Sequence, residues 1–135
     1  MWIAVDIDGT VAFHGARSPY DETRVHEDRP NEPVLAVTRA LFDAGHMLIF
    51  VSGRSEGCRE ATEAWLAKHT RGTASRLYMR PAGDMRKDAV VKRELFDRHI
   101  RDRFDVRAVL DDRDQCVTLW RSLGLTCLQV ADGNF

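Results

Sequence analysis

The sequence predicts one open α/β domain with a parallel sheet of about five strands, and two observations support this. Five short apolar runs recur along the chain, at 2–5, 47–51, 76–79, 108–110 and 127–130. Each run is too short for a helix and lacks strict alternation, as expected for strands that are buried on both faces. Segments with helical apolar spacing separate the runs, and strands that alternate with helices pair in parallel through right-handed crossovers.

Four segments carry the helical spacing. The first begins near Pro33 and ends at Gly45, because proline favours the first turn of a helix and glycine favours its end. The second ends near Gly72 and the fourth at Gly124. The apolar residues of the four segments are Val34, Val37, Leu41 and Phe42; Ala61, Trp65 and Leu66; Val90, Val91, Leu95 and Phe96; and Val117, Leu119, Trp120 and Leu123.

Length and composition limit the class of protein. The 135 residues are 44% hydrophobic and 30% charged, with a net charge of −1, so we expect one domain over 1–135 and no strong basic field for nucleic acid. Cys58, Cys116 and Cys127 show no metal-finger spacing, and such cysteines suit a reducing compartment. We find no signal-peptide pattern and no apolar run of about 20 residues, so we expect a cytoplasmic protein without a membrane partner.

One polar segment interrupts the pattern. Residues 13–32 contain Gly, Pro and alternating charges without a core period, and we expect them to form a flap over the site, directly after the first strand. Phe13 and Tyr20 lie on this segment. Two interpretations of them stay open: they stack on a nucleobase, or they pack within the flap.

Acidic residues follow the strands at the edge where reactive groups gather in parallel sheets. Asp6 and Asp8 come after the first strand, 52–54 (Ser-Gly-Arg) after the second, and Asp111 and Asp112 after the fourth. Such crowded carboxylates must be neutralised, and oxygen ligands without sulfur or imidazole select a hard ion. The sequence therefore predicts a Mg²⁺ site formed by Asp6, Asp8, Asp111 and Asp112.

A helical segment supplies positive charge. Asp88 and Lys92 stand at i and i+4, so they share one helix face, and we expect Asp88 to orient Lys92 towards an anion and keep it protonated. The alternative is an ordinary surface ion pair. Residues 86–107 carry eight cations against five acids, which indicates a mild bias towards a polyanion.

These motifs resemble those of the haloacid dehalogenase superfamily, whose members have a Rossmann-like three-layer sandwich. The four motifs are DIDGT at 6–10, Ser52, Lys92 and the pair at 111–112. The segments RSPYD, VSGR, MRKDAVVK, FDVRAVLDDRDQCVTLWR and QVADGNF are similar to the phosphatase domain of the bacteriophage polynucleotide kinase/3′-phosphatase family, over essentially the whole chain. The resemblance implies a domain without a large cap.

The resemblance also implies roles for the residues. Asp6 would be the nucleophile that forms an aspartyl-phosphate, and Asp8 the general acid and base. Mg²⁺ would be held by Asp6, the backbone carbonyl of Asp8, and Asp112, with Asp111 supporting it through water. Thr10 would orient the loop.

The remaining implied roles concern the substrate. Ser52, Gly53 and Lys92 would bind phosphoryl oxygens, while Arg17 and Arg54 would contact the substrate. Asp88 is also counted among the substrate-binding residues, because we expect it to orient Lys92.

The function implied is removal of 3′-phosphates from polynucleotide ends, in DNA or RNA, during end-healing. A small-molecule phosphatase of the same superfamily remains the alternative; the absence of a cap favours a polymeric substrate, since small substrates usually need a lid. A receiver-type signalling domain fits less well, because its phosphorylated Asp would follow the third strand, where 79–81 read Met-Arg-Pro. No GxxxxGK[ST] motif occurs, so we expect no kinase activity, and a kinase or ligase on a separate chain is a candidate partner.

Overall fold

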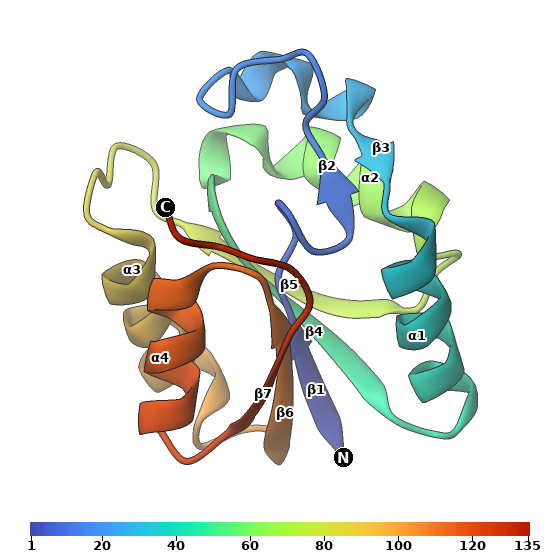
Figure 1. Ribbon diagram of the computed structural model, residues 1–135, viewed down its shortest axis with the longest axis vertical. Helices are drawn as coiled ribbons and strands as arrows, with labels where there is room; N and C mark the ends of the chain where they lie inside the picture. The colour runs from blue at the N-terminus through green and yellow to red at the C-terminus, as the bar shows by residue number, and fades with distance from the viewer.

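A five-stranded parallel sheet forms the centre of the protein, in a computed structural model that describes all residues 1–135 (Figure 1). Its order is β5-β4-β1-β6-β7. The strands are β1 (Trp2–Val5), β4 (Met47–Ser55), β5 (Ala74–Arg80), β6 (Val106–Asp111) and β7 (Thr126–Gln129). The predicted α/β architecture is confirmed. The crossovers put β1 in the middle, so the loops after β1, β4 and β6 meet at one edge of the sheet.

Helices cover both faces of the sheet (Figure 1). One layer holds α1 (Glu32–Asp43) and α2 (Arg59–His69), and the other holds α3 (Asp88–Leu95) and α4 (Asp114–Ser122). A single π-helical turn, η3 (Phe96–Ile100), continues α3. The predicted start and end of the first helix are confirmed. Pro33 lies in the first turn of α1, and Gly45 follows its end with a φ of 96°.

Alternate residues of β1 face the two helical layers, so two cores form. Ile3 and Val5 pack towards α1 and α2, and Ala4 packs towards α3 and α4. Burial on both faces explains the uninterrupted apolar runs of the central strands. The edge strands β5 and β7 are not buried on both faces as predicted. They lack a neighbouring strand on one side and keep partly exposed residues. All three cysteines are free and buried, and burial raises the pKa of Cys116 to about 12.

The segment 13–32 is more ordered than the sequence predicts. It contains a two-stranded antiparallel ribbon of β2 (Ala12–Phe13) and β3 (Arg29–Pro30), and a 3₁₀ helix, η1 (Glu22–Glu27). Val25 of η1 is fully buried in a small cluster with Cys58 and Met79. The expected flap therefore carries short elements of its own, which the sequence does not predict because one buried valine and a two-residue ribbon produce no periodic pattern.

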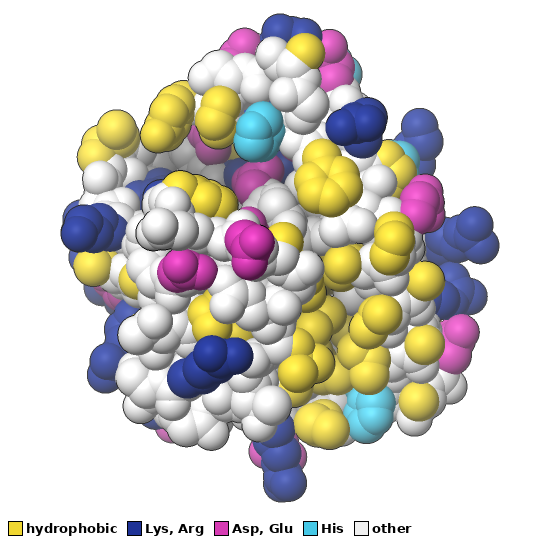
Figure 2. Space-filling model, viewed as in Figure 1, with side chains coloured by type: hydrophobic (Ala, Val, Ile, Leu, Met, Phe, Trp, Pro, Cys, Tyr) yellow, Lys and Arg dark blue, Asp and Glu magenta, His cyan; other side chains and the backbone are white.

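The segment 13–32 lies above the carboxyl edge of the sheet. Figure 2 shows a hollow beneath it, with acidic and basic side chains at its floor. No helix of the chain has the length and apolar character needed to cross a membrane.

Candidate active site

A buried lysine lies between two aspartates at the carboxyl edge. Asp6 follows β1, Asp111 ends β6, and Lys92 reaches both from α3. Lys92 Nζ is 2.7 Å from Asp6 Oδ1 and 2.9 Å from Asp111 Oδ2. The lysine side chain is only 1% exposed. Charges buried this deeply persist only with partners, so the three side chains form one electrostatic unit.

A third carboxylate completes an acidic group. Ligand oxygens of Asp6, Asp111 and Asp112 lie within 4.8 Å of one another, and all three residues are buried. Thr10 Oγ1 donates to Asp6 Oδ2 at 3.1 Å and lies 3.5 Å from Asp112 Oδ1. The hydroxyl therefore connects the loop after β1 to the loop after β6.

Gly9 makes this close approach possible. Its φ is 82°, a left-handed conformation that suits glycine, and an added Cβ would lie 2.1 Å from Asp112 Oδ2. The DxDGT spacing thus has a steric reason in this fold. Only a residue without a side chain allows the Asp112 carboxylate to pack against the turn.

The acidic group contains more negative charge than Lys92 balances. Burial raises the pKa of Asp6, against the pull of Lys92 and with a contribution from Asp111 and Asp112. Burial also raises the pKa of Asp112. Burial alone would lower the pKa of Lys92, but Asp111 and Asp6 outweigh it and hold that pKa above its usual value. The group therefore favours an added cation.

Asp8 turns away from this acidic group, against the prediction that four carboxylates converge. Its Oδ2 accepts from Arg54 Nε at 2.9 Å, and its Oδ1 accepts from Arg54 Nη2 at 2.8 Å. Arg17 Nη2 is 3.4 Å from the same Oδ1. The Asp8 side chain is 38% exposed, unlike the buried carboxylates of the acidic group. A bidentate arginine satisfies it better than a crowded anionic site would.

Asp28 is a buried partner that the sequence analysis missed. Arg17 donates to it from Nε at 2.6 Å and from Nη2 at 2.9 Å, and Arg54 Nη2 donates to it as well. Its side chain is 0% exposed. Trp65 Nε1 donates to the Asp28 carbonyl at 2.8 Å and anchors this part of the flap on α2. No periodic or motif signal in 13–32 distinguishes this aspartate from its neighbours.

Ser52 and Gly53 line the end of β4. Ser52 is fully buried, and its Oγ accepts from the Arg54 amide at 3.1 Å. An added Cβ on Gly53 would lie 2.2 Å from Asp88 Oδ1, so α3 packs directly on this turn. The structure therefore brings the two residues to the same edge as Asp6 and Lys92.

Asp88 does not form the expected ion pair with Lys92. Arg80 Nη2 lies 2.6 Å from Asp88 Oδ1, and Arg113 Nη1 lies 3.0 Å from Asp88 Oδ2. Burial alone would raise the pKa of Asp88, but the charges of Lys92 and Arg113 lower it. The i,i+4 pair is absent because Lys92 reaches Asp6 instead, which a spacing rule within one helix cannot anticipate.

Three further residues support the acidic group. Trp120 Nε1 donates to Asp111 Oδ2 at 3.0 Å. Gln129 Nε2 donates to the Asp112 carbonyl at 2.9 Å. Gly133 packs so closely on that carbonyl that an added Cβ would lie 2.0 Å from it. The QVADGNF segment thus wraps around the loop after β6, which gives this terminal motif a structural purpose.

Most of the basic residues of 86–107 form ion pairs with acids of the same segment. Arg93 and Arg101 pair with Asp97, Arg86 and Arg98 pair with Glu94, and Arg107 pairs with Asp105. The acids of these pairs are already counted in the balance of eight cations against five acids, so the pairs leave the net charge of the segment unchanged, and only Arg86 and Lys92 also pair with acids outside it.

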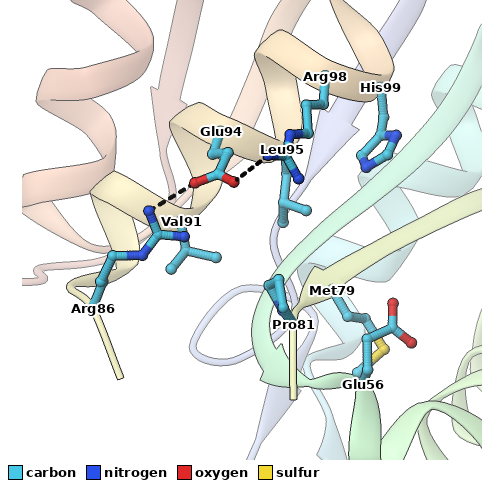
Figure 3. A pocket seen from close by; sticks show the side chains of 9 residues that line it. All are labelled: Glu56, Met79, Pro81, Arg86, Val91, Glu94, Leu95, Arg98 and His99. Carbon is cyan, nitrogen blue, oxygen red and sulfur yellow. Dashed lines mark ion pairs between the residues drawn. The ribbon is translucent and has the colours of Figure 1, made fainter. Parts of the chain in front are cut away.

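A separate pocket of about 180 Å³ lies between the end of β5 and α3 (Figure 3). Arg86 and Arg98 reach into this region, and both are paired with Glu94 (Figure 3). None of the acidic group lines it. The pocket is therefore distinct from the candidate active site.

Comparison with known proteins identifies the family of this chain. The family model described as "Polynucleotide kinase PNKP phosphatase domain" matches residues 1–135. A relative from Autographa californica nuclear polyhedrosis virus, named "Putative bifunctional polynucleotide kinase/RNA ligase", is 37% identical over 123 residues, covering 90% of this chain and 18% of the relative.

Two solved structures are also similar. One is described as "Structure of Pnkp1/Rnl/Hen1 complex" and the other as "Structure of the Pnkp1/Rnl/Hen1 RNA repair complex". Each matching chain has a TM-score of 0.93, 39% identity and 98% coverage of this chain; this chain covers 46% and 43% of them. The chain thus spans less than half the length of these relatives, and it belongs to the polynucleotide kinase PNKP phosphatase domain family.

Proposed function

We propose that this domain removes 3′-phosphates from polynucleotide ends in a Mg²⁺-dependent reaction that passes through an aspartyl-phosphate. The observation that carries the proposal is the buried group of Asp6, Lys92, Asp111 and Asp112, in which three acids face one lysine. Membership of a polynucleotide phosphatase family supports the substrate class.

The acidic group fits a hard divalent cation. Its ligands are carboxylate oxygens within 4.8 Å of one another, and Gly9 leaves room for Asp112 to approach. Asp6 and Asp112 would hold Mg²⁺ together with the backbone carbonyl of Asp8, and Asp111 would support it through water. When bound, Mg²⁺ would cancel negative charge and polarise a phosphoryl oxygen.

The proposed reaction uses the two acids of the DxD motif. An Asp6 oxygen attacks phosphorus while the bond to the 3′ oxygen breaks, and Asp8 donates a proton to that leaving oxygen. Asp8 then takes a proton from the water that attacks the aspartyl-phosphate, which releases phosphate and restores Asp6. The contrast between the two residues supports these roles, since Asp6 is buried beside Lys92 and the Asp8 side chain is 38% exposed.

The surrounding residues are proposed to bind the phosphoryl group. Lys92, the Ser52 hydroxyl and the Gly53 amide would take its oxygens, and Thr10 would orient the loop after β1. Arg17 and Arg54 would contact the substrate on the flap side. Their present contacts with Asp8 support this, because an arriving phosphate is the kind of ligand for which such guanidinium groups are suited.

The names of the relatives support partners as well. One relative is named as a kinase and RNA ligase, and the solved structures are described as complexes that contain Pnkp1, Rnl and Hen1. We propose that this domain acts beside a kinase and a ligase in the repair of nucleic-acid ends, with RNA ends among its substrates.

The test measures phosphate release from matched oligonucleotides phosphorylated at the 3′ or the 5′ end, in RNA and DNA, with Mg²⁺ and with EDTA. We expect release from the 3′ end only, loss with EDTA, and loss in Asp6→Asn. Asp105→Asn is the matched control, because Asp105 is exposed and pairs only with Arg107. Equal release from both ends, or release confined to small phosphate esters, would instead support the small-molecule alternative.

A further inference from the structure

Two of the most exposed apolar side chains lie on two loops at the carboxyl end of the sheet. Tyr20 and Met85 are each 92% exposed. Tyr20 lies on the loop between β2 and η1, and Met85 on the loop between β5 and α3. Both loops extend from the carboxyl end of the sheet (Figure 1).

A buried arginine holds the Tyr20 loop from inside. Arg17 Nη1 donates to the carbonyls of Ser18, Pro19 and Asp21 at 3.1, 3.4 and 3.4 Å, on both sides of Tyr20. The arginine side chain is only 2% exposed. The exposed position of Tyr20 is therefore fixed by the fold.

A second arginine holds the Met85 loop in the same way. Arg80 Nη1 donates to the carbonyls of Asp84 and Arg86, the two neighbours of Met85. Its Nη2 also pairs with Asp88. Met85 is thus held at the tip of its loop with its side chain in solvent.

Both arginines also reach the site itself. Arg17 Nη2 lies 3.4 Å from Asp8, and Arg80 Nε donates to the Gly53 carbonyl at 2.7 Å. The same two arginines therefore contact the loops of the candidate active site and hold the backbone on which Tyr20 and Met85 lie. Binding to such a preorganised pair avoids the entropic cost of ordering a loop.

We propose that Tyr20 and Met85 form a subsite for the terminal nucleoside of the phosphorylated end. This inference rests on the proposed function. A nucleobase offers a flat apolar face, which stacks on a tyrosine ring and contacts a methionine thioether favourably. A phosphate ester without a base gains nothing there, so the subsite selects polynucleotide ends over other phosphate esters.

The test compares two oligonucleotides that carry the same 3′-phosphate, one with a terminal base and one with an abasic terminal position. Tyr20→Ala and Met85→Ala should each raise KM for the first roughly tenfold, and leave KM for the second at the wild-type value. Tyr20→Phe should keep the wild-type KM, because it retains the ring. Val37→Ala, which removes an exposed apolar side chain of α1, is the matched control.

Two results would overturn the subsite. One is an unchanged KM for both substrates in the alanine variants. The other is an equal rise for both, which would indicate a general effect on the site. A wild-type protein that cleaves small esters but neither oligonucleotide would refute the proposed function and the subsite together. If only the subsite is wrong, the wild-type protein still releases phosphate from the oligonucleotides, so the two failures are distinguishable.

Discussion

Replacing Asp28 by asparagine removes the negative charge that lies between two buried guanidinium groups. Arg17 and Arg54 both donate to this carboxylate, and their side chains are each 2% exposed. The asparagine oxygen can still accept a hydrogen bond, but its NH₂ group would face an arginine donor. The substitution therefore keeps the volume and breaks the electrostatic balance.

The burial of all three side chains determines how much free energy of unfolding the Asp28→Asn substitution should remove. An exposed pair contributes about 0–1 kcal/mol, whereas loss of one partner of a buried pair costs about 3–5 kcal/mol. Asp8 remains as a second acid beside both arginines, so we take the lower end, about 3 kcal/mol. For a chain of 135 residues this corresponds to a fall in Tm of roughly 10 °C.

Thermal and urea unfolding would measure the effect. Asp43→Asn is the control, since Asp43 is 60% exposed and pairs with Arg39 on the surface of α1; its free energy of unfolding should stay within about 0.5 kcal/mol of the wild type. If Asp28→Asn is also within that range, the two guanidinium groups do not depend on Asp28, and the reasoning from burial fails.

Three other predictions concern the acidic group. Gly9→Ala should abolish phosphatase activity and the rise in Tm that we expect Mg²⁺ to produce in the wild type, since its Cβ would lie 2.1 Å from Asp112 Oδ2; a retained Mg²⁺ effect would contradict the steric argument. Asp112→Asn should also lose both, yet stabilise the metal-free protein by on the order of 1 kcal/mol at neutral pH, because burial raises the pKa of Asp112 and its ionised form is disfavoured in the folded state. That gain should grow as pH rises above about 4 and vanish below it, where the folded and unfolded carboxyls are both protonated; a gain independent of pH in urea unfolding would refute it. Trp120→Phe should destabilise the protein by about 1–3 kcal/mol in the same assay, because Asp111 loses a buried donor, and an unchanged stability would show that Lys92 satisfies Asp111 alone.

Local patterns were enough to predict the elements and most of the motif positions. The runs at 2–5 and 47–51 became β1 and β4, and the chain order of strands and helices implied that Asp6, Ser52 and Asp111 would share an edge. Burial on both faces produces such runs directly, so these strands can be predicted from the sequence. The order of the segment 13–32 could not be predicted, because it depends on one buried valine and a network of side chains around Asp28.

The sequence by itself determined which chemical groups stand at the carboxyl ends of the strands, since strand periodicity and turn glycines are properties of neighbouring residues. Only the tertiary structure decided how the charges pair. Lys92 binds Asp6, 86 positions away, in place of Asp88, and Asp8 binds Arg54, 46 positions away, in place of joining the acidic group. The physical reason is that the energy of a charge pair depends on distance and burial in three dimensions, and neither is encoded in spacing along the chain.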